Sequence, residues 1–105
     1  MSYDTLDAFI GDLPALAAPV KDKLVGHDGL FKIECGDRTE FLELTDGVLT
    51  VSATSDHDPL CVIKADEKQL MEIINGRVSP MKALLFGKVS IRGDVKPLLK
   101  LCSLL

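Results

Sequence analysis

Apolar residues recur at intervals of three and four through the first quarter of the chain, a pattern that predicts an amphipathic helix. The positions that share this face are Leu6, Phe9, Ile10, Leu13, Leu16, Ala17, Val20 and Leu24. A proline inside a helix removes a backbone hydrogen bond and clashes with the preceding turn, so Pro14 predicts a break, with Asp12 capping the second segment. We therefore expect two short helices, about Thr5–Ile10 and Leu13–Leu24.

The period changes to two in the middle of the chain, as in half-buried strands. Apolar and polar residues alternate in Phe31–Cys35, in Thr39–Leu44 and in Val48–Thr54. Gly36–Asp37 and Asp46–Gly47 lie between these runs, and each is a tight-turn signal. These three segments therefore predict an antiparallel meander with one polar face.

Two further strands are expected in the second half. Leu60–Ala65 is almost entirely apolar, which predicts a strand that is central in the sheet or covered on both faces. Lys88–Arg92 alternates again, with Val89 and Ile91 inward. Strands that follow one another, with helices grouped early and late, are typical of an α+β domain in which helices cover one face of a sheet.

Capping residues mark three helices near the end of the chain. Asp66 suits the start of a helix that stops at Asn75–Gly76. Ser79 and Pro80 suit the cap and first position of a short helix over Met81–Phe86. The last helix is expected over Val95–Leu104.

The segment from Leu70 to Leu105 holds more large aliphatic side chains than a chain of 105 residues needs for a core. The last helix is apolar on more than one side, so it must be buried on more than one side. Such a helix fits over an apolar tunnel, in a dimer interface or on a solid core, and the pattern alone leaves these three alternatives open.

Composition narrows the function. The net charge is −4, Trp is absent and aromatic residues make up 5%, which argues against nucleic-acid binding and leaves at most transient contact with an anionic membrane. No apolar run approaches the length of a membrane span. The start of the chain lacks the features of a secretion signal, so we expect a cytoplasmic protein.

The sequence offers little catalytic or metal-binding chemistry. The three cysteines form no Cys-x-x-Cys pair, which indicates reduced, packed thiols rather than a zinc site. His27 and His57 fall beside aspartates in expected loops and are interpreted as parts of solvated turns. Neither a nucleophile motif nor a phosphate-binding loop is present. We therefore expect no catalytic residue, metal or cofactor.

Basic residues gather in the last third of the chain, where they suit an acidic lipid head group, the phosphates of a thioester or a solvated surface. They are Arg77, Lys82, Lys88, Arg92, Lys96 and Lys100.

The segment from Asp66 to Asp94 resembles the sterol carrier protein 2 family. The order and spacing of Gly76-Arg77, Ser79-Pro80, Phe86-Gly87-Lys88 and Ile91-Arg92-Gly93-Asp94 match the turns and caps of that family. The resemblance extends over about Leu13 to Leu105. In this chain Arg77 stands where the family usually has Lys, and Ser79 where it usually has Asn. The peroxisomal targeting tripeptide of some members is absent, which suits a free-standing bacterial or archaeal domain.

The resemblance implies a five-stranded, largely antiparallel sheet with helices over one face and an apolar tunnel between them. A length of 105 residues independently indicates one domain, over residues 1–105. The ligand would be a sterol, a fatty acid, a fatty acyl-CoA or a phospholipid, with its head group near Lys88, Arg92 or Lys100. By segment, the tunnel-lining residues would be Leu70, Ile73, Ile74, Met81, Leu84, Leu85, Phe86, Leu98 and Leu101.

Two functional hypotheses follow. The first is non-enzymatic binding of a lipid for carriage or presentation. The alternative is an accessory module whose cavity is filled by its own side chains. Such a module would act as a homodimer or as a docking subunit for an enzyme of lipid or isoprenoid-quinone metabolism.

Overall fold

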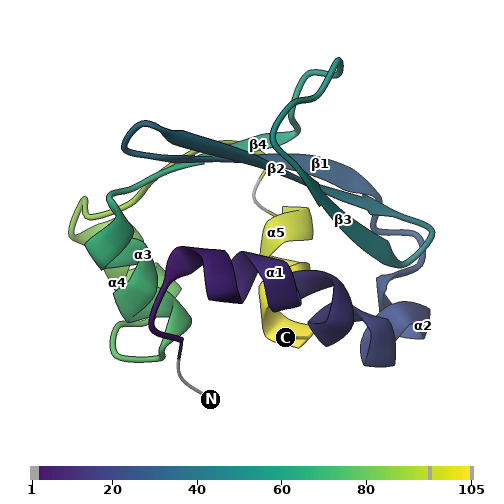
Figure 1. Cartoon of the computed structure of the whole chain (residues 1–105), viewed down its shortest axis with the longest axis horizontal. Coiled ribbons are helices and arrows are strands. Elements are labelled where there is room, and N and C mark those ends of the chain that lie inside the picture. Colours follow the sequence, from purple (N-terminus) through teal and green to yellow (C-terminus); the bar gives the residue numbers. More distant parts are fainter. Residues whose placement is uncertain (1–2, 95, 105) are drawn as a thin grey trace.

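A five-stranded sheet forms one layer of the protein, and the helices form a second layer on one of its faces (Figure 1). The computed structural model describes residues 3–94 and 96–104, leaving aside the side chains of Pro80, Met81, Leu84, Leu99 and Cys102. The strand order is β3-β2-β1-β4-β5. The strands are β1 (Gly29–Cys35), β2 (Arg38–Thr45), β3 (Val48–Ser52), β4 (Cys61–Lys64) and β5 (Ser90–Gly93).

The sheet is mixed but mostly antiparallel. The hairpins β1–β2 and β2–β3 and the pair β4–β5 are antiparallel. Only β1 and β4 run parallel among the described strands, with Ile33 opposite Ile63. The meander therefore continues only through β3, after which residues 53–60 carry the chain to the other side of β1. The predicted α+β class and five-stranded, largely antiparallel sheet are confirmed.

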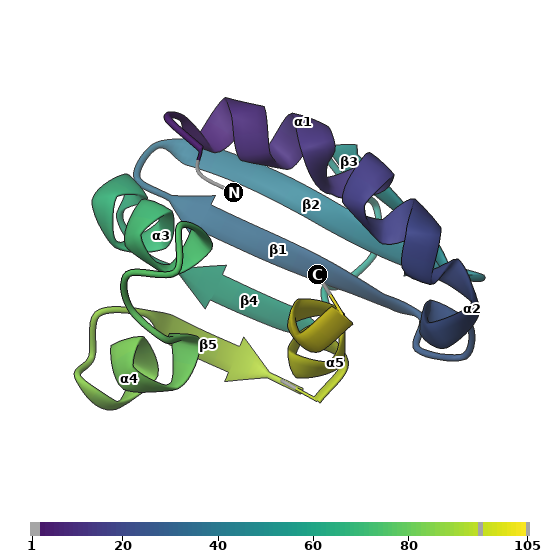
Figure 2. The ribbon, with the colours of Figure 1, turned by 90° about the horizontal axis from the view of Figure 1, so that it is seen from below.

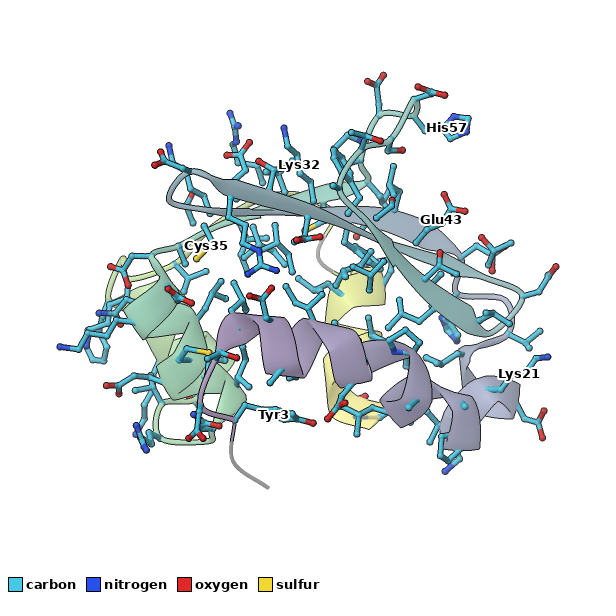
Figure 3. The ribbon with its side chains drawn as sticks, in the orientation of Figure 1. Tyr3, Lys21, Lys32, Cys35, Glu43 and His57 are labelled. Atoms are coloured by element: carbon cyan, nitrogen blue, oxygen red, sulfur yellow. The ribbon has the colours of Figure 1, made fainter. Side chains whose placement is uncertain are left out.

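The period-two pattern determines which face of the sheet is buried. Phe31, Ile33 and Cys35 of β1 are buried under the helices, whereas Lys32 lies on the outer face (Figure 3). The apolar run Leu60–Ala65 was expected to be either central in the sheet or covered on both faces. Strand β4 is central, because it lies between β1 and β5. It is not covered on both faces, since Lys64 is exposed.

The expected helix break at Pro14 is wrong. One helix, α1 (Leu6–Ala17), runs through Pro14 and continues into η1 (Ala18–Val20) and α2 (Lys21–Leu24). The cap is Thr5, whose Oγ1 accepts from the Ala8 N–H at 3.1 Å, rather than Asp12. The buried residues explain why the helix continues through Pro14. Leu6, Ile10, Leu13 and Ala17 share one buried helix face. Burial of this face by one continuous helix offsets the hydrogen bond that Pro14 cannot donate.

The predicted caps of the later helices are confirmed. The Asp66 carboxylate accepts from the Gln69 N–H at 2.7 Å at the start of α3 (Glu67–Ile74). Ser79 Oγ accepts from the Lys82 N–H at 3.1 Å at the start of α4 (Pro80–Leu85). The last helix, α5 (Lys96–Leu104), follows β5; its expected first residue, Val95, lies outside the described residues.

The helices are spread unevenly under the sheet (Figure 2). The long α1 lies along the β2–β3 side, α3 lies at one end of β1 and β4, and α5 lies near the other end of β4. These three helices and the sheet enclose the centre of the protein from four sides.

Candidate ligand-binding cavity

A cavity of about 420 Å³ lies between the sheet and the helices. Its walls come from the N-terminal segment, four strands, the residue before β5 and three helices. The lining residues are Tyr3, Leu6, Phe9, Leu13, Leu16, Ile33, Leu42, Ile63, Leu70, Ile73, Ile74, Val89, Ile91, Leu98 and Leu101. The volume falls within the range of about 300–1,000 Å³ that is usual for small-molecule sites.

Regular spacing places these side chains around one space. In the sheet, Ile33, Ile63 and Ile91 lie opposite one another on β1, β4 and β5 and form a continuous apolar floor. The helices supply their residues at intervals of three and four, as Leu98 and Leu101 do on α5. A helix presents such positions on one face, so each helix forms a wall rather than a single contact.

The lining is almost purely hydrocarbon. Among the described lining residues, Tyr3 is the only one with a hydroxyl group, and none is charged. Among the residues that the structure describes, no polar or charged residue is buried. A site with so few polar side chains selects a ligand mainly by apolar burial and shape.

Several lining residues are only half-buried, which gives the cavity contact with solvent. Phe9 of α1 and Ile73 and Ile74 of α3 are among them. The cavity therefore reaches the solvent beside α1 and α3.

The N-terminal segment closes part of this side. Tyr3 is labelled in Figure 3 beside the start of α1, and its ring meets that of Phe9 edge-on, with centroids 5.3 Å apart. Desolvation and a hydrogen bond with Asp12 raise the pKa of Tyr3 above its ordinary value of 10.0. The hydroxyl is therefore neutral at physiological pH and adds no charge to the cavity.

An ion-pair cluster fastens α1 to the inner face of β2. Arg38 pairs with Asp7 of α1 and, at 3.1 Å, with Glu40. The hydrogen bond with Asp7 is the main reason why the pKa of Arg38 lies above its usual range. None of the three residues lines the cavity, so their charges do not enter it.

The structure brings five of the nine sequence-predicted site residues together at the cavity. Those five are Leu70, Ile73, Ile74, Leu98 and Leu101. Leu85 and Phe86 do not line it: their exposed fractions are 77% and 73%. The short α4 buries Ala83 instead, and the end of this helix projects away from the core. The predictions for Met81 and Leu84 concern side chains outside the described ones.

Sequence reasoning missed the contribution of the first half of the chain. The apolar pattern predicts that Leu6, Phe9, Leu13 and Leu16 share one helix face, but it does not indicate that this face lines a cavity. The spacing of apolar residues in a sequence distinguishes buried from exposed positions, but it does not distinguish a solid core from a hollow one. Only the arrangement of the backbone in space identifies these residues as lining the cavity.

The residues considered for other chemistry lie away from the cavity. His57 lies on the loop that projects beyond the sheet (Figure 3), and His27 is exposed. Lys88, Arg92 and Lys100 are exposed and do not line the cavity. Over residues 3–94 and 96–104, no cluster of His, Cys, Asp or Glu could hold a metal ion.

A second hollow, of about 460 Å³, lies where β1 and β4 end. Glu34, Thr39, Lys64 and Asp66 are among its lining residues. Lys64 and Asp66 are exposed, so this hollow is a solvated, mixed-charge surface. The apolar cavity is therefore the candidate functional site.

This fold, a five-stranded sheet with helices on one face, is that of solved sterol carrier proteins. The sequence profile of the SCP-2 sterol transfer family matches residues 10–105, and the chain belongs to that family. A search among curated protein sequences finds no match. None of the described helices is both long and apolar enough to cross a membrane.

Solved structures show the same fold. A double mutant of the sec-alkyl sulfatase PisA1, an enzyme from Pseudomonas sp., shares 28% identity at a TM-score of 0.86. The match covers 96% of this chain but only 16% of the sulfatase chain, so this chain spans a small part of that enzyme.

Two smaller proteins are similar over most of their own length. Palmitated SCP2L2 from Aedes aegypti has 20% identity and a TM-score of 0.66, with coverage of 94% of this chain and 92% of that one. The ubiquinone synthesis protein UbiJ-SCP2 has 17% identity and a TM-score of 0.66, covering 87% and 77%. At these identities the likeness concerns the fold.

Proposed function

We propose that this chain is a non-catalytic module that binds the hydrocarbon chain of a lipid for carriage or presentation. The observation that carries the proposal is the cavity of about 420 Å³, whose fifteen lining residues include no charged side chain. Membership of the SCP-2 sterol transfer family supports a lipid as ligand.

The size of the cavity favours a single alkyl or acyl chain. An apolar cavity of about 150 Å³ accommodates benzene, which has six carbon atoms. In proportion, a cavity of about 420 Å³ has room for roughly fifteen carbon atoms. A phospholipid with two chains, or a sterol, would require the cavity to widen. The 28% identity with a domain-sized part of a sec-alkyl sulfatase also supports an alkyl ligand.

Burial of the chain supplies the binding free energy. Each methylene removed from water contributes about 0.8 kcal/mol, so roughly fifteen contribute about 12 kcal/mol. The translational and rotational freedom that the ligand loses on binding reduces this free energy by at least about 4 kcal/mol. The difference corresponds to a Kd on the order of micromolar, which permits both uptake and release.

Catalysis finds little support in the described side chains. Cys35 and Cys61 are buried, and burial is the main reason why the pKa of each thiol lies above its ordinary value of 9.0. Such thiols are poor nucleophiles. Two free buried thiols also favour a reducing compartment such as the cytoplasm.

A titration with a homologous series of fatty acids, which displace a fluorescent fatty-acid probe, tests the proposal. The affinity should rise about fourfold for each added methylene, since 0.8 kcal/mol corresponds to that factor. The rise should stop once the cavity is full. Absence of displacement at every chain length would leave the alternative, an accessory module with a closed core.

A matched pair of variants locates the site. Ile73 and Val20 are both half-buried apolar residues that pack on the core, but only Ile73 lines the cavity. The variant Ile73→Phe fills part of the cavity and should lower the affinity for the longest chains about tenfold, whereas Val20→Phe should leave it unchanged. Equal effects of the two substitutions would argue against binding in this cavity.

A further inference from the structure

We propose that the end of α4 docks on an anionic lipid bilayer. The docking surface consists of Lys82, Leu85, Phe86 and Lys88 and is called the α4 tip below. The inference concerns where the protein meets a membrane and does not depend on what the cavity holds.

The first observation is the exposure of two large apolar side chains that follow one another. Leu85 is 77% exposed and Phe86 is 73% exposed, the highest values among the exposed large apolar residues of the described chain. Val25, Val48 and Leu60 lie in other parts of the chain and are less exposed, at 39% to 51%. The α4 tip is therefore the main apolar projection of the described surface.

The backbone holds these side chains outward in a fixed turn. The Phe86 N–H donates to the Lys82 carbonyl at 3.0 Å, and the Lys88 N–H donates to the Ala83 carbonyl at 2.9 Å. On either side of the pair, Ala83 and Val89 are buried in the core. Leu85 and Phe86 thus project from an anchored turn and need no rearrangement to meet another surface.

The second observation is the charge around this projection. Residues 73–93 include four basic residues, Arg77, Lys82, Lys88 and Arg92, and no acidic residue. The net charge of the whole chain is nevertheless −4, so the remainder is strongly acidic. An anionic surface therefore attracts this segment and repels the acidic remainder of the chain, which orients the α4 tip toward that surface.

The combination of two apolar side chains and neighbouring cations favours a bilayer over a protein partner. Aromatic and aliphatic side chains enter the boundary between head groups and acyl chains, while Lys and Arg pair with anionic head groups. A stable protein interface needs about 800 Å² from each partner, far more than two side chains provide. A lipid surface needs no such complementary area.

The position of α4 leaves the tip accessible. In both ribbon views α4 lies at the end of the molecule opposite α2 (Figures 1 and 2). Figure 2 shows α4 beside β5, the edge strand of the sheet. Because Val89 and Ile91 of the same region line the cavity, docking here would bring the cavity to the membrane.

Flotation of the whole chain with vesicles tests the proposal. Vesicles of phosphatidylcholine alone are compared with vesicles that contain about one third phosphatidylglycerol, since only the latter attract cations. The protein should float with the anionic vesicles only, and added salt should release it. The proposal would be overturned if the protein floated with neither type of vesicle or equally with both. Absence of flotation with both types would favour an acidic protein surface as the partner instead.

Matched substitutions identify the surface. Phe86→Ser should weaken binding to anionic vesicles about tenfold by removing apolar burial, and Lys88→Glu should weaken it at least about fivefold by reversing a charge. Val48→Ser and Lys23→Glu change an exposed apolar residue and an exposed lysine on β3 and α2, and both should bind as the unchanged protein does. Comparable losses in the control pair would contradict docking through the α4 tip.

Fatty-acid titration of the same variants separates this inference from the proposed function. Phe86→Ser and Lys88→Glu alter exposed residues outside the cavity lining, so their fatty-acid affinity should be unchanged. The protein could bind vesicles through the α4 tip and yet bind no fatty acid. That result would support the docking surface and contradict the proposed ligand.

Discussion

The side chain of Asn75 holds the backbone of Tyr3 by two reciprocal hydrogen bonds. The Tyr3 N–H donates to Asn75 Oδ1 at 2.7 Å, and Asn75 Nδ2 donates to the Tyr3 carbonyl at 3.0 Å. These bonds join positions 72 residues apart and fasten the N-terminal segment to the end of α3. Tyr3 and Ile74 both line the cavity, so the bonds close its border at this point.

Loss of this clasp should loosen the border without removing the cavity. Asn75→Ala deletes both partly buried hydrogen bonds and should lower the free energy of unfolding by about 1–2 kcal/mol, measured by urea denaturation. The Ser52→Ala variant, which loses one exposed hydrogen bond to the Thr54 carbonyl, should change it by less than about 0.5 kcal/mol. Similar changes in both variants would mean that the clasp contributes little.

The Asp7–Arg38–Glu40 cluster leads to a second prediction. The side chain of Glu40 is only 16% exposed, so Arg38→Met would leave a partly buried carboxylate without its nearest cation. We expect a loss of about 1 kcal/mol, because the pair is partly solvated. The double variant Arg38→Met with Glu40→Gln should recover part of that loss. If the double variant is no more stable than the single one in urea denaturation, the unpaired charge is not the cause.

The outer face offers a matched control for the ion-pair prediction. Lys32 and Glu34 are 3.1 Å apart, and their side chains are 30% and 29% exposed. Because the Glu34 carboxylate keeps more contact with water than that of Glu40, Lys32→Met should change the free energy of unfolding by less than about 0.5 kcal/mol. If Lys32→Met destabilises the protein more than Arg38→Met does, the burial of the carboxylate does not determine the contribution of these ion pairs.

Thiol reactivity provides a third prediction. Desolvation, followed by the charges of Glu67 and Asp66, raises the pKa of Cys35, and desolvation, followed by Asp94, raises that of Cys61. In a Cys102→Ser background, both thiols should react slowly with a disulfide reagent at pH 8 and rapidly once the chain is unfolded in urea. Fast reaction of the folded protein would contradict their burial.

The same shifts determine the sign of a pH effect on stability. Because the pKa of each thiol is higher in the folded state, the unfolded chain loses its thiol protons first as the pH rises. The contribution of Cys35 and Cys61 to stability should therefore be complete below the ordinary pKa of 9.0 and decline above it. Replacement of both thiols by Ala should flatten that decline in denaturation curves recorded across this range.

Gly93 gives a fourth prediction, on the strand that joins the cavity floor to α5. Its φ is +98°, and a Cβ there would lie 2.3 Å from the Leu60 carbonyl oxygen. Gly93→Ala should therefore destabilise the fold by about 2–4 kcal/mol. Gly36 has φ +61° and open space around it, so Gly36→Ala should lower the stability by only about 1–2 kcal/mol. Equal thermal shifts would refute the close approach.

The fold was largely predictable because its local signals agree. Asp66 and Ser79 cap helices as expected, and the alternation around Phe31–Cys35 identifies the buried face of β1. The break at Pro14 was not predictable in this way. Whether a proline interrupts a helix depends on the apolar surface that the continuous helix buries, and that surface comes from distant parts of the chain.

The cavity was only partly predictable. Five expected residues line it, but Leu85 and Phe86 project from the surface. Both residues are large and apolar at the end of a helix, which in a sequence indicates burial. Their exposure depends on how few residues α4 contains and on the turn at Gly87, and neither feature is expressed in the apolar pattern itself.

The central claim is that an alkyl chain occupies the cavity between the sheet and the helices. The most direct test is NMR of protein with labelled Ile and Leu methyl groups, titrated with a fatty acid of about twelve carbons, a length that fits the volume estimated from known apolar cavities. We expect intermolecular contacts from the fatty-acid chain to the methyl groups of Ile63, Ile73 and Leu98, which line the cavity, and none to exposed Leu85. Contacts confined to Leu85, or no change in any methyl group, would contradict it.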